Sequence, residues 1–301
     1  MQPKFSIVTA CMGRLDHLKR TLPRLLELPD AEVIVVDYSC PQGTAAFVAE
    51  HFPKAKVVKV EGQDAFSNWR ARNAGAAAAT GRLLIFSDAD TLLKPTALQW
   101  IGDHLEPRTF GHFDRIATSR FNTAKLRLGY NQLRGFHVLP LAMFRRFGGY
   151  DEVLEGYAAG ADTDLEARMV LFGFKRLVLD PEIVEEVIEH DNEDRVRHHK
   201  IPIRVSYAAG YLYRKAKIAL LRIRRRPNLP LPMRQKLYSA AMKAATNFAE
   251  GQERAMINVD VENEAIGMPL QLGYKKARFK MTLACSIVGE DAVDEIPAHI
   301  D

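Results

Sequence analysis

A short apolar run that ends in two aspartates constrains the fold of this chain more than any other stretch. Residues 83–86 are apolar, follow a Thr-Gly turn signal, and precede Asp88 and Asp90. Such a run predicts a buried strand, and open α/β sheets bind their ligands at the carboxyl ends of their strands. Two carboxylates at that place suit Mg²⁺ or Mn²⁺ bridging a diphosphate, whereas an isolated Asp-x-Asp is more often a solvated turn.

The first 190 residues alternate strand-like and helix-like segments, which is the pattern of an α/β domain. Pro23 interrupts the leucine pattern of the first helix and predicts a kink or a restart. Ser67 is expected to cap the start of the third helix, and Gly81 is expected to lie past its end. The signatures of the two commonest nucleotide-binding folds, Gly-x-Gly-x-x-Gly and a phosphate-loop Lys-Ser/Thr pair, are missing. The predicted strands cover residues 5–10, 32–37, 56–60 and 83–86, and the predicted helices cover residues 15–26, 43–52 and 67–80.

The positive charge of the chain is concentrated in one segment. The 301 residues have a formal net charge of +5, yet residues 195–249 contain 14 lysines and arginines and no acidic residue, which leaves −9 for the rest. Two helical patterns occupy this segment, over residues 203–226 and 234–250, with prolines between them. Such segregation predicts an anionic partner, either nucleic acid or a membrane surface, although a solvated helix face is its commonest meaning.

Several protein classes do not fit the sequence. No run approaches the ~18 apolar residues of a membrane span, and the first residues lack the layout of a signal peptide. The three cysteines, Cys11, Cys40 and Cys285, form no metal-ligand spacing and leave an odd count. We therefore expect a cytoplasmic protein, either free or peripheral at the inner face of the membrane.

A series of short motifs follows one order over residues 5–191. The first four are Phe5-Ser-Ile-Val-Thr-Ala, Val35-Val-Asp-Tyr-Ser, Asn68-Trp-Arg-Ala-Arg-Asn-Ala-Gly75 and Leu84-Ile-Phe-Ser-Asp-Ala-Asp90. The later ones, similar to the acceptor-side signature of galactosyltransferase-type enzymes, are Arg134-Gly-Phe, Phe144-Arg-Arg-Phe-Gly-Gly-Tyr-Asp-Glu152 and Gly160-Ala-Asp-Thr-Asp-Leu165. In this order the motifs resemble family 2 glycosyltransferases of the GT-A fold. The resemblance implies a GT-A α/β domain over residues 1–200, with a mixed, mostly parallel sheet flanked by helices. A helical, basic subdomain over residues 201–301 would follow it.

The same resemblance implies an inverting, metal-dependent glycosyltransferase of the hexosyltransferase type. Its donor would be a nucleotide-diphosphate sugar, UDP-linked by preference, and its acceptor a hydroxyl of a glycan or of a lipid-linked molecule. Asp88 and Asp90 would bind Mn²⁺ or Mg²⁺, and Asp88 would also touch the donor. His190 matches the position of a third metal ligand and would favour Mn²⁺, although a lone histidine is more often structural or merely exposed.

Residues for the acceptor and the nucleotide follow from the same motifs. Asp162 aligns with the general base of inverting members, but it also opens a helical pattern and competes as a helix N-cap. Asp164 is the second choice for the base. The usual glutamate before this aspartate is Ala161 here, which puts the acceptor's identity in doubt. The residues that the resemblance places on the nucleotide are Thr9, Arg14, Asp37, Arg72 and Asn73.

Other roles compete with these assignments. The position of Asp37 is also typical of a turn residue that caps a loop. The position of Arg72 is also typical of a cation on the surface of a helix. For the basic residues 195–226 we favour contact with anionic phospholipid, because each surface cation contributes about 1 kcal/mol near an anionic leaflet. A nucleic-acid-binding protein is the rival class, but no nucleic-acid motif is present and its acidic residues would lack a role. A catalytically inactive sugar-nucleotide binder is the third class, and Ala161 is its one hint.

Overall fold

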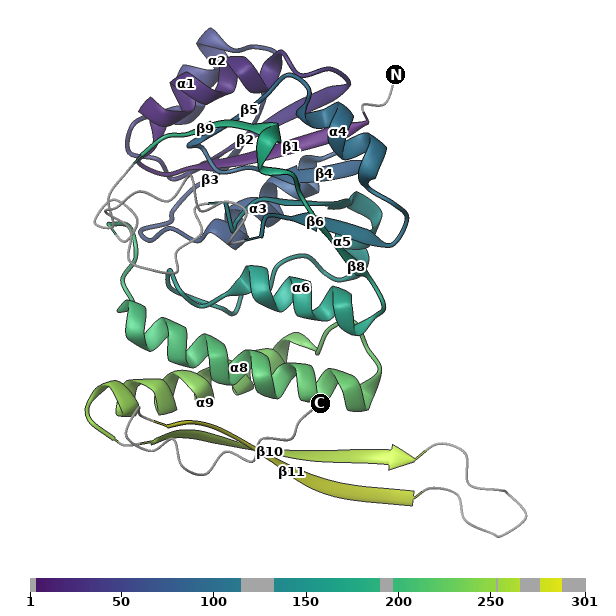
Figure 1. The fold of residues 1–301 in the computed structure, drawn as a ribbon. Coiled ribbons are helices and arrows are strands. Elements are labelled where there is room, and N and C mark those ends of the chain that lie inside the picture. The colour runs from purple at the N-terminus through teal and green to yellow at the C-terminus, as the bar shows by residue number, and fades with distance from the viewer. Residues whose placement is uncertain (1–3, 115–132, 190–196, 253, 266–276, 289–301) are drawn as a thin grey trace. The chain divides into compact units, whose positions relative to one another are not determined.

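The computed structural model describes residues 4–114, 133–189, 197–252, 254–265 and 277–288 of the chain. These residues belong to two compact units, shown in Figure 1. The first unit comprises residues 1–152 and 161–200, and the second comprises residues 153–160 and 201–301. Every residue of the candidate site below lies in the first unit.

The first unit is built on a seven-stranded sheet with the strand order β3-β2-β1-β4-β7-β6-β8 among the described residues. Its strands are β1 (Phe5–Cys11), β2 (Ala31–Tyr38), β3 (Lys56–Val60), β4 (Leu83–Phe86), β6 (Thr109–His112), β7 (His137–Pro140) and β8 (Lys175–Val178). Neighbouring strands are parallel, except that β7 runs antiparallel to both β4 and β6. The expectation of a mixed, mostly parallel sheet is therefore confirmed.

Helices cover both faces of this sheet, so its strands are apolar on both sides. The helices are α1 (Leu15–Leu26), α2 (Thr44–His51), α3 (Asn68–Ala78), α4 (Ala97–His104), α5 (Leu141–Arg146), α6 (Ala161–Leu171) and the short 3₁₀ helix η2 (Pro181–Ile183). The leucines on one face of α1 pack into a core with Ile7 of β1, Val35 of β2 and Ile85 of β4. These three strands are neighbours in the sheet. Figure 1 shows β1 and β2 passing between α1 and α3.

Two local expectations met different outcomes. Ser67 caps α3 as predicted, since its hydroxyl accepts a hydrogen bond from Arg70 N at 3.4 Å. Pro23 does not restart α1, which runs as one helix from Leu15 to Leu26. The proline lies near the helix end, so it removes only one interior hydrogen bond, and the buried leucines on either side outweigh that loss.

Helix α3 lies unusually close to the sheet because Gly75 faces β1 and β2. A Cβ at this position would come within 2.4 Å of Val8 Cγ1 and 2.9 Å of Val36 Cγ2. Trp69 is buried at the other end of the same helix. This close packing brings the polar residues of α3 to the carboxyl ends of the neighbouring strands.

A second, two-stranded sheet crosses the carboxyl end of β4. Strand β5 (Thr91–Leu93) directly follows the two aspartates and pairs antiparallel with β9 (Val184–Val187). Ile188 N, just past β9, donates to Asp90 O at 2.8 Å. The pairing therefore places the last described residues before His190 beside Asp90.

In the second unit, residues 153–160 are followed after residue 200 by two helices, α8 (Ile203–Arg224) and α9 (Leu231–Ala249), which pack against each other. The helical segment predicted after residue 200 is confirmed. Beyond it the chain forms an antiparallel pair, β10 (Arg254–Ala265) and β11 (Ala277–Val288), which the sequence did not reveal. No helix within the described ranges is both long enough and apolar enough to cross a bilayer.

Candidate active site

One buried arginine joins acidic residues from distant parts of the first unit. Arg72 on α3 donates through Nη2 to Asp88 Oδ1 at 2.6 Å. Its Nη1 lies 3.4 Å from Asp162 Oδ1. Asp88 follows β4, and Asp162 lies in the first turn of α6. The guanidinium therefore draws together two carboxylates that stand 74 residues apart in the sequence.

Arg72 keeps its charge in this position. Its side chain is only 2% exposed, and its guanidinium lies over the rings of Phe86 and Tyr150. Burial lowers the pKa of an arginine, but the negative charges of Asp88 and Asp162 outweigh that effect and raise the pKa of Arg72. The alternative of a helix-surface cation is thus wrong for this residue.

The two carboxylates, unlike the arginine, reach solvent. The Asp88 side chain is 34% exposed and that of Asp162 is 22% exposed. Helix α6 begins at Ala161, so Asp162 lies inside the helix and is not its N-cap. Asp164, the second choice for a base, is fully buried and pairs with Arg168 at 2.7 Å. Of the two candidate bases, only Asp162 is accessible.

The chain passes close to this ion pair at Gly135. A Cβ there would lie 2.7 Å from Arg72 Nη2 and 2.8 Å from Asp88 Oδ2. Gly135 belongs to the Arg-Gly-Phe motif just before β7. The glycine of this motif is therefore required for steric reasons, because any side chain would press on Arg72 and Asp88.

A second buried chain of polar groups adjoins Asp162. The Tyr150 hydroxyl lies 3.4 Å from Arg72 Nη1 and 3.1 Å from His137 Nδ1. The other nitrogen of the imidazole, Nε2, lies 3.1 Å from Glu166 Oε1. Burial raises the pKa of Glu166, but the hydrogen bond and charge of His137 outweigh it and hold that pKa at about 2. Glu166 is therefore ionised at neutral pH.

Sequence patterns alone did not identify Tyr150, His137 or Glu166 as site residues. His137 follows Gly-Phe and precedes Val-Leu, so it is the lone polar residue of a buried strand. A buried polar side chain needs a hydrogen-bond partner. The histidine in this apolar run was therefore the sequence feature that could have indicated a polar network. The partners were not readable, because Tyr150 follows α5 and Glu166 lies on α6, and both reach His137 only through tertiary packing.

The predicted metal ligands are only partly described. Asp88 and Asp90 bracket Ala89, and Thr91 Oγ1 lies 3.4 Å from Asp90 Oδ1. His190 lies outside the described residues. Within the described ranges no group of three or more His, Cys, Asp or Glu side chains is arranged to hold a metal ion. Two carboxylates together with diphosphate oxygens nevertheless form a donor set that suits Mg²⁺ or Mn²⁺, so the residues present fit the expected ion.

Three of the predicted nucleotide residues lie at the ends of β1 and β2. Thr9 is fully buried in β1, and its hydroxyl has no hydrogen-bond partner within the described part of the chain. Arg14 stands at the start of α1 with Nη1 3.4 Å from His17 Nδ1. The Asp37 oxygens accept from Cys40 N at 2.8 Å and Ala45 N at 2.7 Å. Asp37 thus caps its own loop, and each of its oxygens has a further lone pair.

Asn73 holds the loop that follows Gly149. Its Oδ1 accepts from Tyr150 N at 3.0 Å, and its Nδ2 donates to Tyr150 O at 3.0 Å and to Glu152 Oε1 at 2.7 Å. Gly149 has a φ of +68°, and a Cβ there would meet Asn73 Oδ1 at 2.5 Å. The amide therefore fixes the position of Tyr150 through its backbone.

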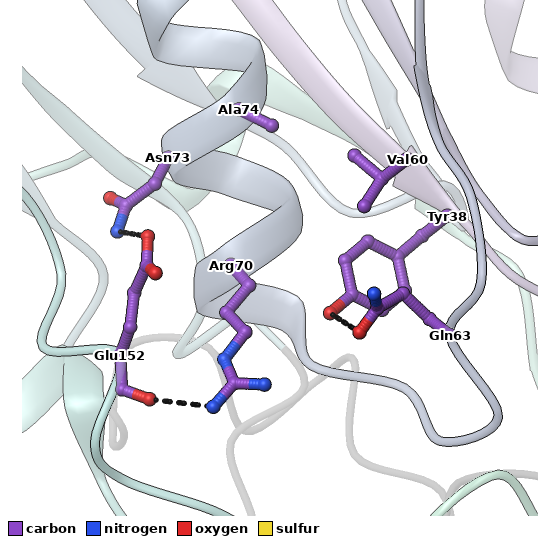
Figure 2. A pocket seen from close by; sticks show the side chains of 7 residues that line it. All are labelled: Tyr38, Val60, Gln63, Arg70, Asn73, Ala74 and Glu152. Atoms are coloured by element: carbon purple, nitrogen blue, oxygen red, sulfur yellow. Dashed lines mark hydrogen bonds between the residues drawn. The ribbon is translucent and has the colours of Figure 1, made fainter.

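An open pocket of about 490 Å³ lies beside α3, on the β2–β3 side (Figure 2). Tyr38 donates through its hydroxyl to Gln63 Oε1 at 3.1 Å, and Arg70 Nη2 donates to Glu152 O at 3.1 Å. The wall combines an aromatic ring with donors and acceptors, which suits a polar organic ligand. Its lining residues are Tyr38, Val60, Gln63, Arg70, Asn73, Ala74 and Glu152.

Two cysteines meet at the same edge of the sheet. Cys11 and Cys40 are free thiols whose Sγ atoms lie 3.9 Å apart. The hydrogen bond from Cys11 lowers the pKa of Cys40 to about 5, against the opposing effect of burial. Cys40 Sγ also accepts from Gly13 N at 3.2 Å. The pair therefore ties the turn after β1 to the loop after β2.

Comparison with known proteins agrees with this architecture. The structure is similar to that of S. aureus TarS 1-349 in complex with UDP-GlcNAc, with a TM-score of 0.56 and 16% identity over 81% of this chain and 72% of that one. It is also similar to the mannosyltransferase PcManGT from Pyrobaculum calidifontis in complex with GDP-Man and Mn²⁺, with a TM-score of 0.50 and 17% identity over 84% and 77% of the two chains. The sheet, its helices and these neighbours define a GT-A fold.

Part of the sequence is also similar to a known family. Residues 6–149 match the family model described as glycosyl transferase family 2. Among curated proteins none matches this sequence. The galactosyltransferase-type signature, which extends from Arg134 to Leu165, lies only partly within the matched stretch and stays a prediction.

Proposed function

We propose that this protein is an inverting, metal-dependent glycosyltransferase that uses a nucleotide-diphosphate sugar, UDP-linked by preference. The observation that carries the proposal is the convergence of Asp88 and Asp162 on the buried Arg72 at the carboxyl edge of the sheet. Sugar transfer requires that the leaving diphosphate be neutralised and that the acceptor hydroxyl lose its proton. The cluster offers a group for each requirement.

Asp88, Asp90 and His190 would hold Mn²⁺ or Mg²⁺ at the diphosphate. The ion, when bound, would neutralise the charge that develops on the leaving group. Arg72 adds a fixed positive charge at the same place, held by α3 and by Phe86 beneath it. The hydrogen bond from Ile188 N to Asp90 O supports a role for His190, since it brings the chain to Asp90 two residues earlier.

Asp162 would act as the general base. Its carboxylate would accept the proton of the acceptor hydroxyl while that oxygen attacks the anomeric carbon from the face opposite the leaving diphosphate, which inverts the configuration. Its exposure and the fixed Arg72 beside it support this role. Asp164 would instead anchor α6, because its partner Arg168 also donates to Phe147 O at 2.6 Å and to Gly149 O at 2.7 Å.

The nucleotide would bind along the ends of β1 and β2 and the start of α3. Thr9, Arg14, Asp37, Arg72 and Asn73 would form this subsite. The pocket beside α3, with Asn73 in its wall, supports the proposal. Because the amide of Asn73 already donates both hydrogens to the loop at residues 150–152, its contribution would be to position that loop.

The acceptor would be a hydroxyl of a glycan or of a lipid-linked molecule, reached at an anionic membrane surface through residues 195–226. Helix α8 supports this surface. Ile203 and Tyr207 are exposed on it, at 49% and 57%, together with Arg222. Apolar and aromatic groups interleaved with cations are typical of helices that lie in a membrane interface.

The central experiment measures binding and turnover of nucleotide sugars. A panel of UDP- and GDP-sugars with Mn²⁺ should raise the melting temperature of the native protein, because a ligand that binds only the native state stabilises it. Asp90→Asn and Asp162→Asn should each reduce Mn²⁺-dependent turnover at least about 100-fold, whereas Asp103→Asn, on the exposed end of α4, should not. Unchanged turnover in Asp162→Asn would contradict the proposed base, and a product that keeps the donor's anomeric configuration would contradict inversion.

The membrane surface has its own test. Arg222, Arg224 and Arg225 changed together to glutamate should abolish sedimentation with vesicles of phosphatidylglycerol and phosphatidylcholine. The matched control reverses three cations of the first unit, Lys54, Lys59 and Lys175, and should leave sedimentation unchanged. Equal sedimentation of both triple variants would count against this part of the proposal.

A further inference from the structure

We propose that Cys11 and Cys40 form a site of reversible oxidation, at which hydrogen peroxide converts the two thiols into a disulfide. The pair lies where the turn after β1 meets the loop after β2, beside Arg14 and Asp37 of the proposed nucleotide subsite. We expect the disulfide to weaken nucleotide binding, and this consequence alone rests on the proposed function. All the contacts that support the site lie within the first unit.

The two sulfur atoms are neighbours in the reduced protein. Cys11 ends β1 and is paired with Asp37 of β2, and Cys40 lies in the loop that follows β2. Their Sγ atoms are 3.9 Å apart, and both cysteines are free thiols. A disulfide bond is about 2 Å long, so the sulfurs have to approach each other by roughly 2 Å. Because Cys40 lies in a loop, rotation of the two side chains and a small shift of that loop can supply this movement.

Hydrogen bonds give the two sulfurs different roles. Gly13 N, just before α1, donates to Cys40 Sγ at 3.2 Å, and Thr44 Oγ1 donates to Cys11 Sγ at 3.2 Å. The hydrogen bond between the two sulfurs is the main cause that lowers the pKa of Cys40 to about 5, and it also raises the pKa of Cys11. Cys40 is therefore ionised at neutral pH, and Cys11 keeps its proton.

Cys40 is also the thiol that an oxidant reaches first. It is 9% exposed, whereas Cys11 is fully buried. The thiolate is the form that attacks peroxides, and redox-sensing cysteines combine a low pKa and access to solvent with a second thiol nearby. In this pair Cys40 has the reactive sulfur and Cys11 is the resolving thiol. Cys285 on β11 differs, because burial raises its pKa.

The reaction balances with hydrogen peroxide as the oxidant. The Cys40 thiolate attacks one peroxide oxygen, the O–O bond breaks, and hydroxide leaves, which gives a sulfenic acid on Cys40. The Cys11 thiol then attacks the Cys40 sulfur, so that the S–S bond forms and the sulfenic hydroxyl leaves with the Cys11 proton as water. The two sulfurs lose two electrons, and the peroxide gains them. An external dithiol restores both thiols and is itself oxidised to a disulfide.

Formation of this bond changes contacts that hold the proposed nucleotide subsite. Gly13 N donates to Cys40 Sγ, and Arg14 is the next residue in the chain. Cys40 N donates to Asp37 Oδ1 at 2.8 Å. A disulfide sulfur is uncharged and accepts hydrogen bonds poorly, so the turn before Arg14 loses this contact, and the shift of Cys40 displaces the Asp37 carboxylate. We therefore expect the oxidised protein to bind UDP less tightly.

The first test detects the bond itself and uses no substrate. Full-length protein with Cys285→Ser is treated with a small molar excess of hydrogen peroxide, and its intact mass is measured by mass spectrometry. The mass should fall by that of two hydrogen atoms, and dithiothreitol should reverse the change. An unchanged mass, or the addition of oxygen without a disulfide, would overturn the proposal.

Adding Cys11→Ser to this protein separates the two chemical steps. Serine keeps an O–H that donates to the Cys40 sulfur but cannot form a disulfide. Oxidation should stop at the sulfenic acid of Cys40, which dimedone labels. If this variant does not fold by circular dichroism, Cys11→Ala replaces it with the same expected product. Absence of label on Cys40 would refute its role as the reactive sulfur.

The second test measures the consequence for binding, with UDP and Mn²⁺ as the probe in isothermal titration calorimetry. Oxidation of the Cys285→Ser protein should raise its Kd for UDP about 10-fold, the effect of losing one hydrogen bond. The matched control carries Cys11→Ser and Cys40→Ser and keeps Cys285, and the same peroxide treatment should leave its Kd unchanged. If the control does not fold, Cys40→Ala alone replaces it. Equal Kd values for the oxidised and reduced Cys285→Ser protein would contradict the consequence.

The oxidation site and the proposed function fail separately. A disulfide that forms in a protein unable to bind UDP even when reduced supports the site and contradicts the nucleotide subsite. Normal UDP binding without a disulfide refutes the oxidation site and leaves the function standing. A disulfide with an unchanged Kd removes only the link between the two.

Discussion

Both ends of the parallel strands carry a network of carboxylates, and the two networks are built differently. The amino edge of the sheet is where these strands begin, and the carboxyl edge is where they end. At the amino edge, Glu32 Oε1 accepts from Ser6 Oγ at 2.5 Å, Thr80 N at 2.6 Å, Thr80 Oγ1 at 2.8 Å and Gly81 N at 3.1 Å, while Oε2 pairs with Lys56. These donors lie at or just before the starts of β1, β3 and β4. At the carboxyl edge, Asp88 and Asp162 share the guanidinium of Arg72 and remain partly exposed.

The difference separates a structural carboxylate from those of the candidate site. Hydrogen bonds surround Glu32, largely from backbone N–H and hydroxyl groups that the fold fixes in place, and its side chain is only 11% exposed. Asp88 and Asp162 have a buried cation on one side and solvent on the other. A carboxylate arranged in this second way has lone pairs available to a ligand, so the carboxyl edge can do chemistry that the amino edge cannot.

The largest expected effect is on the amino edge. In Gly81→Ala the new Cβ would lie 2.6 Å from Phe5 C and 2.6 Å from Ser6 N, so the backbone must shift. We expect a loss of about 3 kcal/mol in the free energy of unfolding, measured by urea denaturation. Gly102→Ala on α4 is the matched control, because its Cβ would crowd the flexible end of Lys4 and would meet Phe5 Cζ at an ordinary contact distance of 3.8 Å. Equal stability of the two variants would contradict this account of the edge.

Removing the shared cation should affect activity more than folding. Arg72→Met keeps an unbranched apolar side chain over Phe86 but leaves Asp88 and Asp162 without their cation. We expect turnover of nucleotide sugars to fall at least about 100-fold and the free energy of unfolding to fall by about 2 kcal/mol. That stability loss is below the usual cost of breaking a buried pair because both aspartates reach solvent. The control is Arg82→Met, because Arg82 is exposed just before β4. Turnover within twofold of wild type in Arg72→Met would contradict the assignment of this cluster as the active site.

Glu32→Gln should reverse that pattern, with a loss of stability and no direct loss of turnover. The amide keeps one acceptor oxygen but presents two hydrogens to surrounding donors, so we expect a cost of about 1–2 kcal/mol. The pKa of Glu32 in the folded protein is about 2, below its usual 4.5, because hydrogen bonds from Lys56, Ser6 and Thr80 outweigh the effect of burial.

The pH dependence of this cost has a definite sign. A depressed carboxylate pKa stabilises the fold above the unfolded value and loses that effect as pH falls through the folded value. The difference in unfolding free energy between wild type and Glu32→Gln should therefore be constant above pH 5 and shrink as pH falls from about 4.5 to about 2. Glu50→Gln, an exposed residue of α2, should show no such change. A difference that grew toward low pH would contradict the assignment.

The sequence allowed the four parallel strands to be predicted nearly to the residue, because each is an apolar run between turn signals. The ribbon of β10 and β11 was missed. Its inward residues Ala255, Ile257 and Val259 alternate with outward ones. The outward residue Met256 is apolar, however, so the alternation of apolar and polar residues that predicts a strand is interrupted. The convergence of Asp88 and Asp162 was anticipated from the motif order. The contacts of His137 were not, because they depend on which strand lies beside β7 and on the phase of α6.

The smallest expected effect on stability tests the carboxyl edge alone. Gly135→Ala introduces a Cβ that would lie 2.7 Å from Arg72 Nη2 and 2.8 Å from Asp88 Oδ2, and both are ends of side chains. Such ends can move, so the free energy of unfolding should change by less than about 1 kcal/mol, against about 3 kcal/mol for the same change at Gly81. The displaced ion pair should still lower turnover about 10-fold, since misplacing a charged group by a few tenths of an ångström weakens its hold on a diphosphate. Turnover unchanged in Gly135→Ala, with Gly102→Ala as the control, would mean that the Arg72–Asp88 geometry does not matter to the reaction.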